Sequence, residues 1–258
     1  MSSPLPPDFE EYVRNAIKAF WQQRLKNSSA AQEGGRGAVI GGKNLDGFTA
    51  LIKKMTVYCG LPEDSVIIQG KSQLTIPGYF RPTKMWDALV VHRDFLIAAF
   101  ELKSQVGSFS NNFNNRTEES VGSAHDFWTA HREGAFDFDN TVDSKYTKTL
   151  PRLYAKPPFL AYLMMLELCS ESTSPVHVEE KHYKVFPDFK NSSYAKRYQL
   201  LCEKLVSEKL YSSSCLMLSD RVNGLRSGAY NSPHLSHSPK SLFADFAAHL
   251  LAAIELYG

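Results

Sequence analysis

The chain of 258 residues carries 29 basic and 27 acidic side chains, so its net charge of +2 is close to neutral. This balance does not by itself indicate a nucleic-acid-binding protein, although a local basic surface remains compatible with it. A hydrophobic content of 43% and a charged content of 22% are typical of a water-soluble globular protein and argue against a disordered or fibrous chain.

The sequence also predicts a cellular setting. It holds no apolar run long enough to cross a membrane, and its first eight residues are polar and proline-rich rather than a signal peptide. The four cysteines lie far apart without Cys-x-x-Cys spacing, which predicts neither a disulfide framework nor a zinc site. We therefore expect a cytoplasmic protein with no membrane segment. Because no linker or internal repeat interrupts the chain, we expect a single domain over 1–258.

The first expected element is a helix over 8–26, where Asp8 and Glu11 form a capping pattern ahead of an apolar stripe. The segment 27–43 is rich in glycine, serine and alanine and is expected to be a loop. The next expected elements are a helix over 45–59 and short strands over 66–69 and 73–76.

Two apolar runs follow, Trp86–Val91 and Phe95–Lys103, and the polar corner between them predicts a β-hairpin folded about Asp94. The segment 104–115 is polar and asparagine-rich, and a helix is expected over 116–132 after it. The run 159–168 fits a buried strand or a buried helix, and we favour the strand.

The last expected elements are a helix over 194–210, a strand over 215–218, a polar loop over 219–240 and a helix over 241–257. A central sheet flanked by helices, of the α/β or α+β class, is the simplest arrangement of all these elements.

The hairpin carries the strongest chemical signal in the chain. Asp87 is followed, after 13 residues, by Glu101-Leu102-Lys103. A hairpin folded about Asp94 places Asp87 directly opposite Glu101, and cross-strand partners have Cβ atoms roughly 5 Å apart. Two carboxylates at that distance can share a divalent metal ion, and Glu101 and Lys103 project from the same face of their strand. The pattern favours a metal-dependent phosphodiesterase; a structural salt bridge at a strand end is the alternative.

Two further segments contain candidate DNA contacts. The segment 37–44 nearly matches a nucleotide-binding loop, but no strand precedes it, so we reject an NTPase. Arg36, just before this segment, and Lys43 within it remain candidates for contacts with a phosphate backbone, with an ordinary surface loop as the alternative. The candidates elsewhere in the chain are Asn112, Asn114, Asn115, Arg116, Arg221 and Arg226. Asparagine and arginine are residues that read base edges, although the asparagine run also suits a turn that caps the next helix.

Together the hairpin and the segments 36–48 and 104–136 give the chain a wider resemblance. The chain resembles the XhoI-type type II restriction endonucleases of the PD-(D/E)xK nuclease superfamily. The first acidic residue of that signature carries over onto Asp87, the second onto Glu101 and the lysine onto Lys103. Trp86 stands where the signature usually has proline.

The resemblance implies a restriction-endonuclease-like central mixed β-sheet flanked by helices. It also implies a homodimer that cuts double-stranded DNA with Mg²⁺ at the palindrome CTCGAG and leaves 5′-phosphate ends. A cognate DNA methyltransferase would protect the host as a functional partner. Asp87, Glu101 and the carbonyl of Leu102 would hold the metal ion, and Lys103 would orient or help deprotonate the attacking water.

Three other functions are also compatible with the sequence. The chain is compatible with a DNA repair or structure-specific nuclease, with a non-catalytic DNA-binding protein on the same fold, and with a structural domain. Glu10 or Glu11 is a candidate further carboxylate for the metal, and Gln105, on the same strand face as Lys103, is a candidate supporting residue. Ordinary helix surface is the alternative for the two glutamates.

Overall fold

The computed structural model describes residues 3–32, 45–93, 95–136 and 157–257. Its helices are α1 Phe9–Gln32, α2 Asp46–Tyr58, α3 Phe109–Arg132, α4 Ser170–Thr173, α5 Tyr194–Ser207, α6 Arg221–Ser227 and α7 Pro239–Tyr257. Its strands are β1 Val66–Ile67, β2 Thr75–Pro77, β3 Thr83–Met85, β4 Ala88–His92, β5 Phe95–Gln105, β6 Phe159–Glu167 and β7 Ser213–Ser219. Within these ranges no helix combines the length and apolar character needed to span a membrane.

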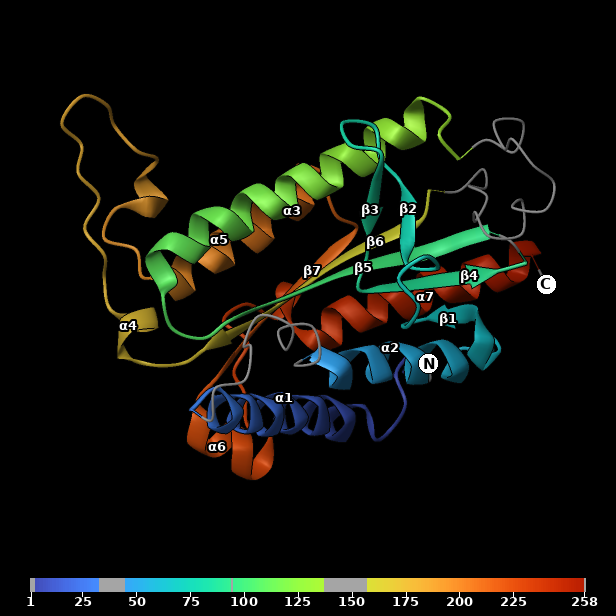
Figure 1. The fold of residues 1–258 in the computed structure, drawn as a ribbon, viewed down its shortest axis with the longest axis horizontal. Helices are drawn as coiled ribbons and strands as arrows, with labels where there is room; N and C mark the ends of the chain where they lie inside the picture. The colour runs from blue at the N-terminus through green and yellow to red at the C-terminus, as the bar shows by residue number, and fades with distance from the viewer. Residues whose placement is uncertain (1–2, 33–44, 94, 137–156, 258) are drawn as a thin grey trace.

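A five-stranded mixed sheet forms the centre of the molecule, in the order β1-β4-β5-β6-β7 (Figure 1). Strand β4 is antiparallel to both of its neighbours, β1 and β5, whereas β5, β6 and β7 run parallel to one another. Parallel strands need crossover connections, and the chain passes through α3 between β5 and β6 and through α5 between β6 and β7. The prediction of a central mixed sheet flanked by helices is confirmed.

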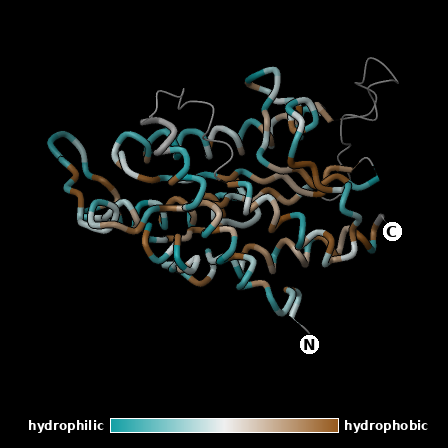
Figure 2. The backbone as a smooth tube through the Cα atoms, turned by 60° about the horizontal axis from the view of Figure 1, so that its bottom comes forward, coloured by the Kyte–Doolittle hydropathy of each residue, from teal (hydrophilic) through white to brown (hydrophobic). Residues whose placement is uncertain are grey.

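Helices cover both faces of this sheet. Helices α1, α2 and α7 pack on one face, and α3 and α5 pack on the other. Strand β6 is buried along nearly its whole length, as expected for a strand covered on both faces. Figure 2 shows the hydrophobic strands running through the interior beneath more hydrophilic outer segments. Side chains alternate along β5, so Phe100 and Leu102 face the α1–α2–α7 layer, whereas Ala99 and Glu101 face α3 and α5.

The β4–β5 hairpin turns more tightly than a symmetric hairpin about Asp94. His92 pairs with Phe95, and Arg93 adopts a positive φ of 49° in the turn. The register then shifts, because Val91 pairs with Leu96 but Val90 pairs with Ala98. Ile97 is the extra residue of a β-bulge. Its backbone carbonyl accepts a hydrogen bond from His249 Nε2 on α7, at 3.1 Å.

Strands β2 and β3 form a separate antiparallel pair that stands beside α3 in Figure 1. The carboxylate of Asp126, on α3, joins this hairpin to the body of the protein. It accepts hydrogen bonds from the backbone amides of Tyr79 and Phe80, each at 2.8 Å, and from Arg81 Nε at 2.7 Å. A β-carbon on Gly78 would lie 2.7 Å from an Asp126 oxygen, so this contact requires glycine.

The structure corrects several of the predicted boundaries. Helix α1 continues to Gln32, beyond the expected end at 26, and strand β3 was not predicted. The polar segment 104–115, for which no helix or strand was predicted, ends β5 and begins α3. Phe109 and Phe113 in this segment contact Tyr194 on α5, so aromatic packing gives the asparagine-rich sequence a buried side on which to form a helix.

The prediction of a polar loop over 219–240 is also wrong, because this segment contains α6 and a short 3₁₀ helix, Leu235–His237. Asp220 caps α6 by accepting a hydrogen bond from the amide of Asn223 at 2.8 Å. Gly228 ends the helix with a φ of 69°.

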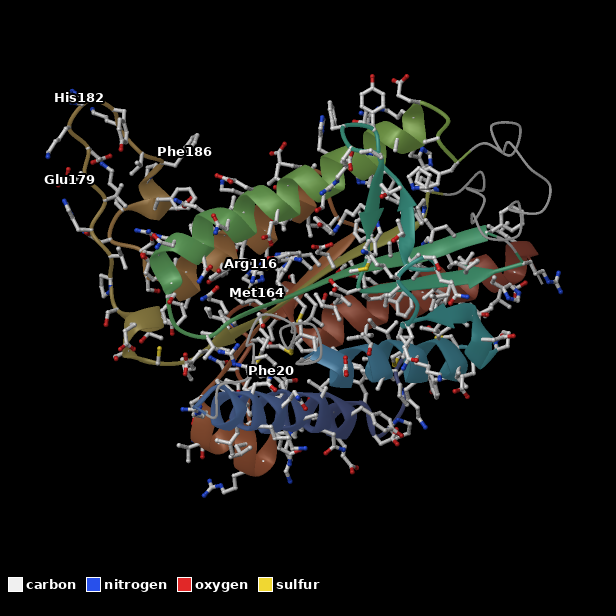
Figure 3. All side chains as sticks on the ribbon, in the orientation of Figure 1. Phe20, Arg116, Met164, Glu179, His182 and Phe186 are labelled. Atoms are coloured by element: carbon white, nitrogen blue, oxygen red, sulfur yellow. The ribbon has the colours of Figure 1, made fainter. Side chains whose placement is uncertain are left out.

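The connection between α4 and α5 stands away from the body of the molecule, and Glu179, His182 and Phe186 lie on it (Figure 3).

Candidate active site

The β4–β5 ladder brings Asp87 and Glu101 to one place. Ala88 pairs with Phe100, and the amide of Asp87 donates to the carbonyl of Phe100 at 3.1 Å, so Asp87 lies opposite Glu101. Asp87 Oδ2 accepts a hydrogen bond from the amide of Leu102 at 2.7 Å. Both carboxylates belong to the sheet face that α3 and α5 cover, because cross-strand partners share a face.

Glu101 is held by two lysines. Its side chain is 2% exposed, and its Oε1 lies 2.5 Å from Lys103 Nζ while its Oε2 lies 2.6 Å from Lys84 Nζ. Burial alone would raise the pKa of the Glu101 carboxyl, but the two ammonium groups outweigh burial and the pKa is lowered. Burial alone would lower the pKa of Lys103, but the charge of Glu101 raises it. Both groups are therefore charged at neutral pH.

Asp87 is in the opposite situation. Burial raises the pKa of its carboxyl, and the nearby negative charge of Glu101 raises it further. The amide of Leu102 and the two lysines act against this rise without cancelling it. Without a bound metal ion, the ionised form of Asp87 is therefore energetically disfavoured, which is typical of a carboxylate that binds a metal ion.

Sequence reasoning did not identify Lys84. It lies on β3, outside the main sheet, and its ammonium group sits 4.5 Å from the centre of the Trp86 ring as well as against Glu101. A three-residue strand offers no periodic pattern, so the only available signal was a lysine three residues before Asp87.

An open cleft of about 460 Å³ leads to the two lysines and Glu101 between the sheet, the β2–β3 hairpin and α3. Its other walls are formed by Phe80, Arg81, Glu118, Glu119, Gly122, Ser123, His125 and Asp126. Glu119, also missed from sequence, has Oε2 at 3.8 Å from Lys103 Nζ and 2.7 Å from Arg116 Nη1. The cleft therefore contains charges of both signs.

The structure places the asparagine candidates on the first half of α3. Asn114 and Asn115 are exposed, whereas Asn112 donates to the carbonyl of Ser108 at 2.9 Å. Arg116 is half-buried and paired with Glu119, at the position that Figure 3 labels. These four residues lie on the helix that lines the cleft. Their role as base contacts stays a prediction.

Other candidates lie elsewhere. Arg221 and Arg226 are exposed on α6, which packs against α1 on the opposite face of the sheet from Glu101. Arg36 and Lys43 lie outside the described residues. Glu10 pairs with Arg14 on α1 and accepts a hydrogen bond from the Tyr230 hydroxyl, so the structure does not bring it to the cleft.

Glu11 lies on the same helix, α1, on the far side of the sheet from the cleft. Gln105 continues the strand face of Lys103 but is buried, and its side-chain amide donates to the carbonyl of Gly107. Neither Glu11 nor Gln105 contributes its side chain to the site formed by Asp87 and Glu101.

The donor groups present suit a magnesium-like ion rather than a zinc-like one. Within the described ranges, no three histidine, cysteine, aspartate or glutamate side chains gather closely enough to hold a metal by themselves. Mg²⁺ is usually bound by one or two carboxylates with waters and substrate phosphates completing its shell. Glu101, which lines the open cleft, and Asp87 opposite it match that requirement, and the main-chain oxygen of Leu102 would be a further hard ligand.

The chain is similar to known restriction enzymes. A protein-family model described as restriction endonuclease XhoI matches residues 24–232. The type II restriction enzyme BstVI of Geobacillus stearothermophilus is 48% identical over 214 residues, which cover 81% of this chain and 87% of that enzyme. The type II restriction enzyme XhoI of Xanthomonas vasicola is 39% identical over 247 residues, covering 92% of this chain and 93% of that enzyme.

A third relative, the type II restriction enzyme AbrI of Azospirillum brasilense, is 43% identical over 183 residues, which cover 69% of this chain and 75% of that enzyme. No solved structure matches the chain significantly. The match to the family model and the high identity over most of the chain lead to one conclusion. The protein belongs to the XhoI family of type II restriction endonucleases.

Proposed function

We propose that the protein cuts both strands of DNA at the palindrome CTCGAG in a Mg²⁺-dependent reaction that leaves 5′-phosphate ends. The observation that carries this proposal is the position of Asp87 opposite Glu101, with Lys103 paired to Glu101 at the edge of an open cleft. A structural salt bridge would not need a second, strained carboxylate at the same point.

Asp87, Glu101 and the carbonyl of Leu102 would hold the ion. Bound Mg²⁺ supplies a water of lowered pKa and neutralises the charge that develops on the phosphate. The chain contributes the position of the reacting groups. Lys103 is an ammonium group at neutral pH because Glu101 raises its pKa, so it suits orienting the attacking water and stabilising negative charge on the phosphate.

The proposed assembly is a two-fold symmetric homodimer. A palindrome has the same symmetry, so each protomer meets one strand with an equivalent cleft. A DNA methyltransferase with the same target is the proposed functional partner, since the host genome would otherwise be cut at each unmodified site.

The test is digestion of a plasmid that carries one CTCGAG site, in Mg²⁺ or in EDTA, with sequencing of the ends. The matched control is the same plasmid with one base pair of the site changed. The expected result is linear DNA from the first plasmid alone and only with Mg²⁺, with 5′-phosphate ends.

Each other outcome removes a defined part of the proposal. Cutting at another sequence would keep the nuclease and remove the target. Cutting at unusual DNA structures rather than at a sequence would favour a structure-specific nuclease. A folded protein that binds DNA but cuts none with any divalent metal would favour a non-catalytic DNA-binding protein.

A further inference from the structure

Each oxygen of the Glu101 carboxylate is paired with a lysine, and the two lysines come from different parts of the fold. Lys103 lies on the same strand, β5, whereas Lys84 reaches the site from the β2–β3 hairpin. The Lys84 side chain is only 11% exposed, and its ammonium group lies between Glu101 Oε2, at 2.6 Å, and the face of Trp86. The ammonium group also donates to the carbonyl of Met85 at 3.4 Å, and a largely buried position with these partners indicates a defined role rather than a chance surface contact.

The occupancy of both oxygens has a direct consequence for a metal ion. A divalent cation bound to Glu101 would sit about 2 Å from a carboxylate oxygen that already contacts an ammonium group. Two cations in contact with one oxygen repel each other strongly. This repulsion favours the departure of one lysine from Glu101 when the metal arrives.

The two lysines differ in how easily they can leave. Lys103 is fixed to the central sheet and is the residue proposed to orient the water. Lys84 stands on a two-stranded hairpin at the rim of the cleft, and its stem can turn into the cleft without disturbing β4 or β5. The cleft is also where a DNA phosphate would enter.

We infer that Lys84 is a positioning residue that occupies the metal's place on Glu101 until a divalent cation binds, and that it then moves to the DNA phosphate. This inference rests on the proposed function. Before binding, the two lysines balance the charges of Asp87 and Glu101. Metal and DNA would then favour each other's binding, because a phosphate in the cleft gives the displaced ammonium group a new partner.

The first experiment measures Mn²⁺ binding to the full-length protein without DNA, by the electron paramagnetic resonance signal of free Mn²⁺. Mn²⁺ prefers the same oxygen ligands as Mg²⁺. Lys84→Met, which removes the charge but keeps most of the volume, should bind Mn²⁺ about tenfold more tightly than wild type, the order expected from loss of one adjacent charge. Lys84→Arg keeps the charge and should bind like wild type.

The matched control is Lys53→Met, which breaks the ion pair between Lys53 and Glu63 on a distant part of the surface and should not change Mn²⁺ affinity. Equal or weaker Mn²⁺ binding by Lys84→Met would overturn the inference, since Lys84 would then only brace Glu101. Wild-type protein that binds no Mn²⁺ would refute the proposed metal site, and the inference would fail with it.

A second measurement uses the unsubstituted protein, so it does not depend on how the Lys84 variants fold. An ammonium group over an indole ring perturbs the emission of that ring. Saturation with Mg²⁺ alone should therefore change the tryptophan fluorescence as Lys84 leaves Trp86, and Trp86→Phe should lack this change. Unchanged emission in wild type that has been shown to bind the ion would contradict the displacement of Lys84.

The inference also separates binding from turnover. Lys84→Met should need less Mg²⁺ than wild type for half-maximal cutting but should have a higher KM for DNA, because the phosphate has lost its ammonium partner. A role limited to holding Glu101 in place would instead raise the Mg²⁺ requirement. The direction of the change in Mg²⁺ requirement therefore decides between the two roles.

Discussion

Asp126 Oδ2 on α3 lies 2.7 Å from Arg81 Nε on the β2–β3 hairpin, and this ion pair fixes the hairpin that brings Lys84 to Glu101. Asp126 is buried and also accepts two backbone amide hydrogen bonds, so it is satisfied by three donors. The geometry of the site thus depends on a contact between two elements that carry neither Asp87 nor Glu101.

Asp126→Asn should loosen the hairpin. The amide removes the charge that Arg81 needs and turns one acceptor into a donor, so we expect unfolding free energy to fall by about 2 kcal/mol. Urea unfolding measures this change, with Asp64→Asn as the control because Asp64 is exposed. DNA cutting should also fall, since Lys84 is carried by the same hairpin. An unchanged unfolding midpoint would show that the hairpin is held by its other contacts.

The same contact predicts a pH dependence. Burial raises the pKa of Asp126, but the hydrogen bonds from Arg81, Phe80 and Tyr79 outweigh burial and lower it below its ordinary value of 3.8. The folded state therefore binds this proton less tightly than the unfolded state does, and the stabilisation is fully present above that value. The stability difference between wild type and Asp126→Asn should shrink as pH falls below it, as urea unfolding at several pH values would measure.

Glu101→Gln should destabilise the protein as well as abolish cutting. The pKa of Glu101 is lowered in the folded state, so its ionised form stabilises the fold at neutral pH. The amide would leave the ammonium groups of Lys84 and Lys103 without the carboxylate that both contact, and loss of one partner from a buried pair typically costs about 3 kcal/mol. Thermal unfolding without metal measures this effect. Wild-type stability would show that the lysines find other partners.

Asp87→Asn should have the opposite effect on stability and the same effect on cutting. The pKa of Asp87 is raised, so its ionised form opposes folding at neutral pH. Asparagine removes the charge and keeps an oxygen that can accept from the amide of Leu102, so we expect a gain of about 1 kcal/mol, or roughly 2–4 °C in Tm. A lower Tm in the absence of metal would contradict the assignment of strain to Asp87.

Lys103→Ala should reduce cutting by about 10²–10⁴-fold while specific DNA binding is retained. The reason is that Lys103 is proposed to act on the attacking water and the charged phosphate rather than on the bases. Gel-shift assays in EDTA and single-turnover cleavage separate the two properties, with Lys53→Ala as the control. A variant that lost binding but cut normally whatever it still bound would show that the assigned role is wrong.

The hairpin could be predicted from sequence because its signals are local. Apolar runs, a polar corner and the two-residue period of a strand place Asp87 against Glu101 without knowledge of the rest of the fold. Helix α6 could also have been predicted, because Asp220 caps its first turn and Gly228 ends it in the left-handed region. The polar composition of the segment favoured a loop instead.

Lys84 and the asparagine run could not be predicted in the same way. The position of Lys84 depends on Asp126, which lies 42 residues away in the chain, and no short pattern encodes such a contact. The run from Asn111 to Asn115 is helical because Phe109 and Phe113 pack on α5, and tertiary packing overrides weak helix propensity.

The bulge at Ile97 is the reason that Asp87 and Glu101 lie on the same face of the sheet. Without this extra residue, the pairing next to the turn would continue along both strands and place Asp87 opposite Phe100. The side chain of Phe100 faces the α1–α2–α7 layer, so the two carboxylates would lie on opposite faces of the sheet. His249 holds the extra residue in place from the last helix. The turn could therefore take Phe95 from the start of β5 without separating Asp87 from Glu101, provided that the bulge is lost in the same step.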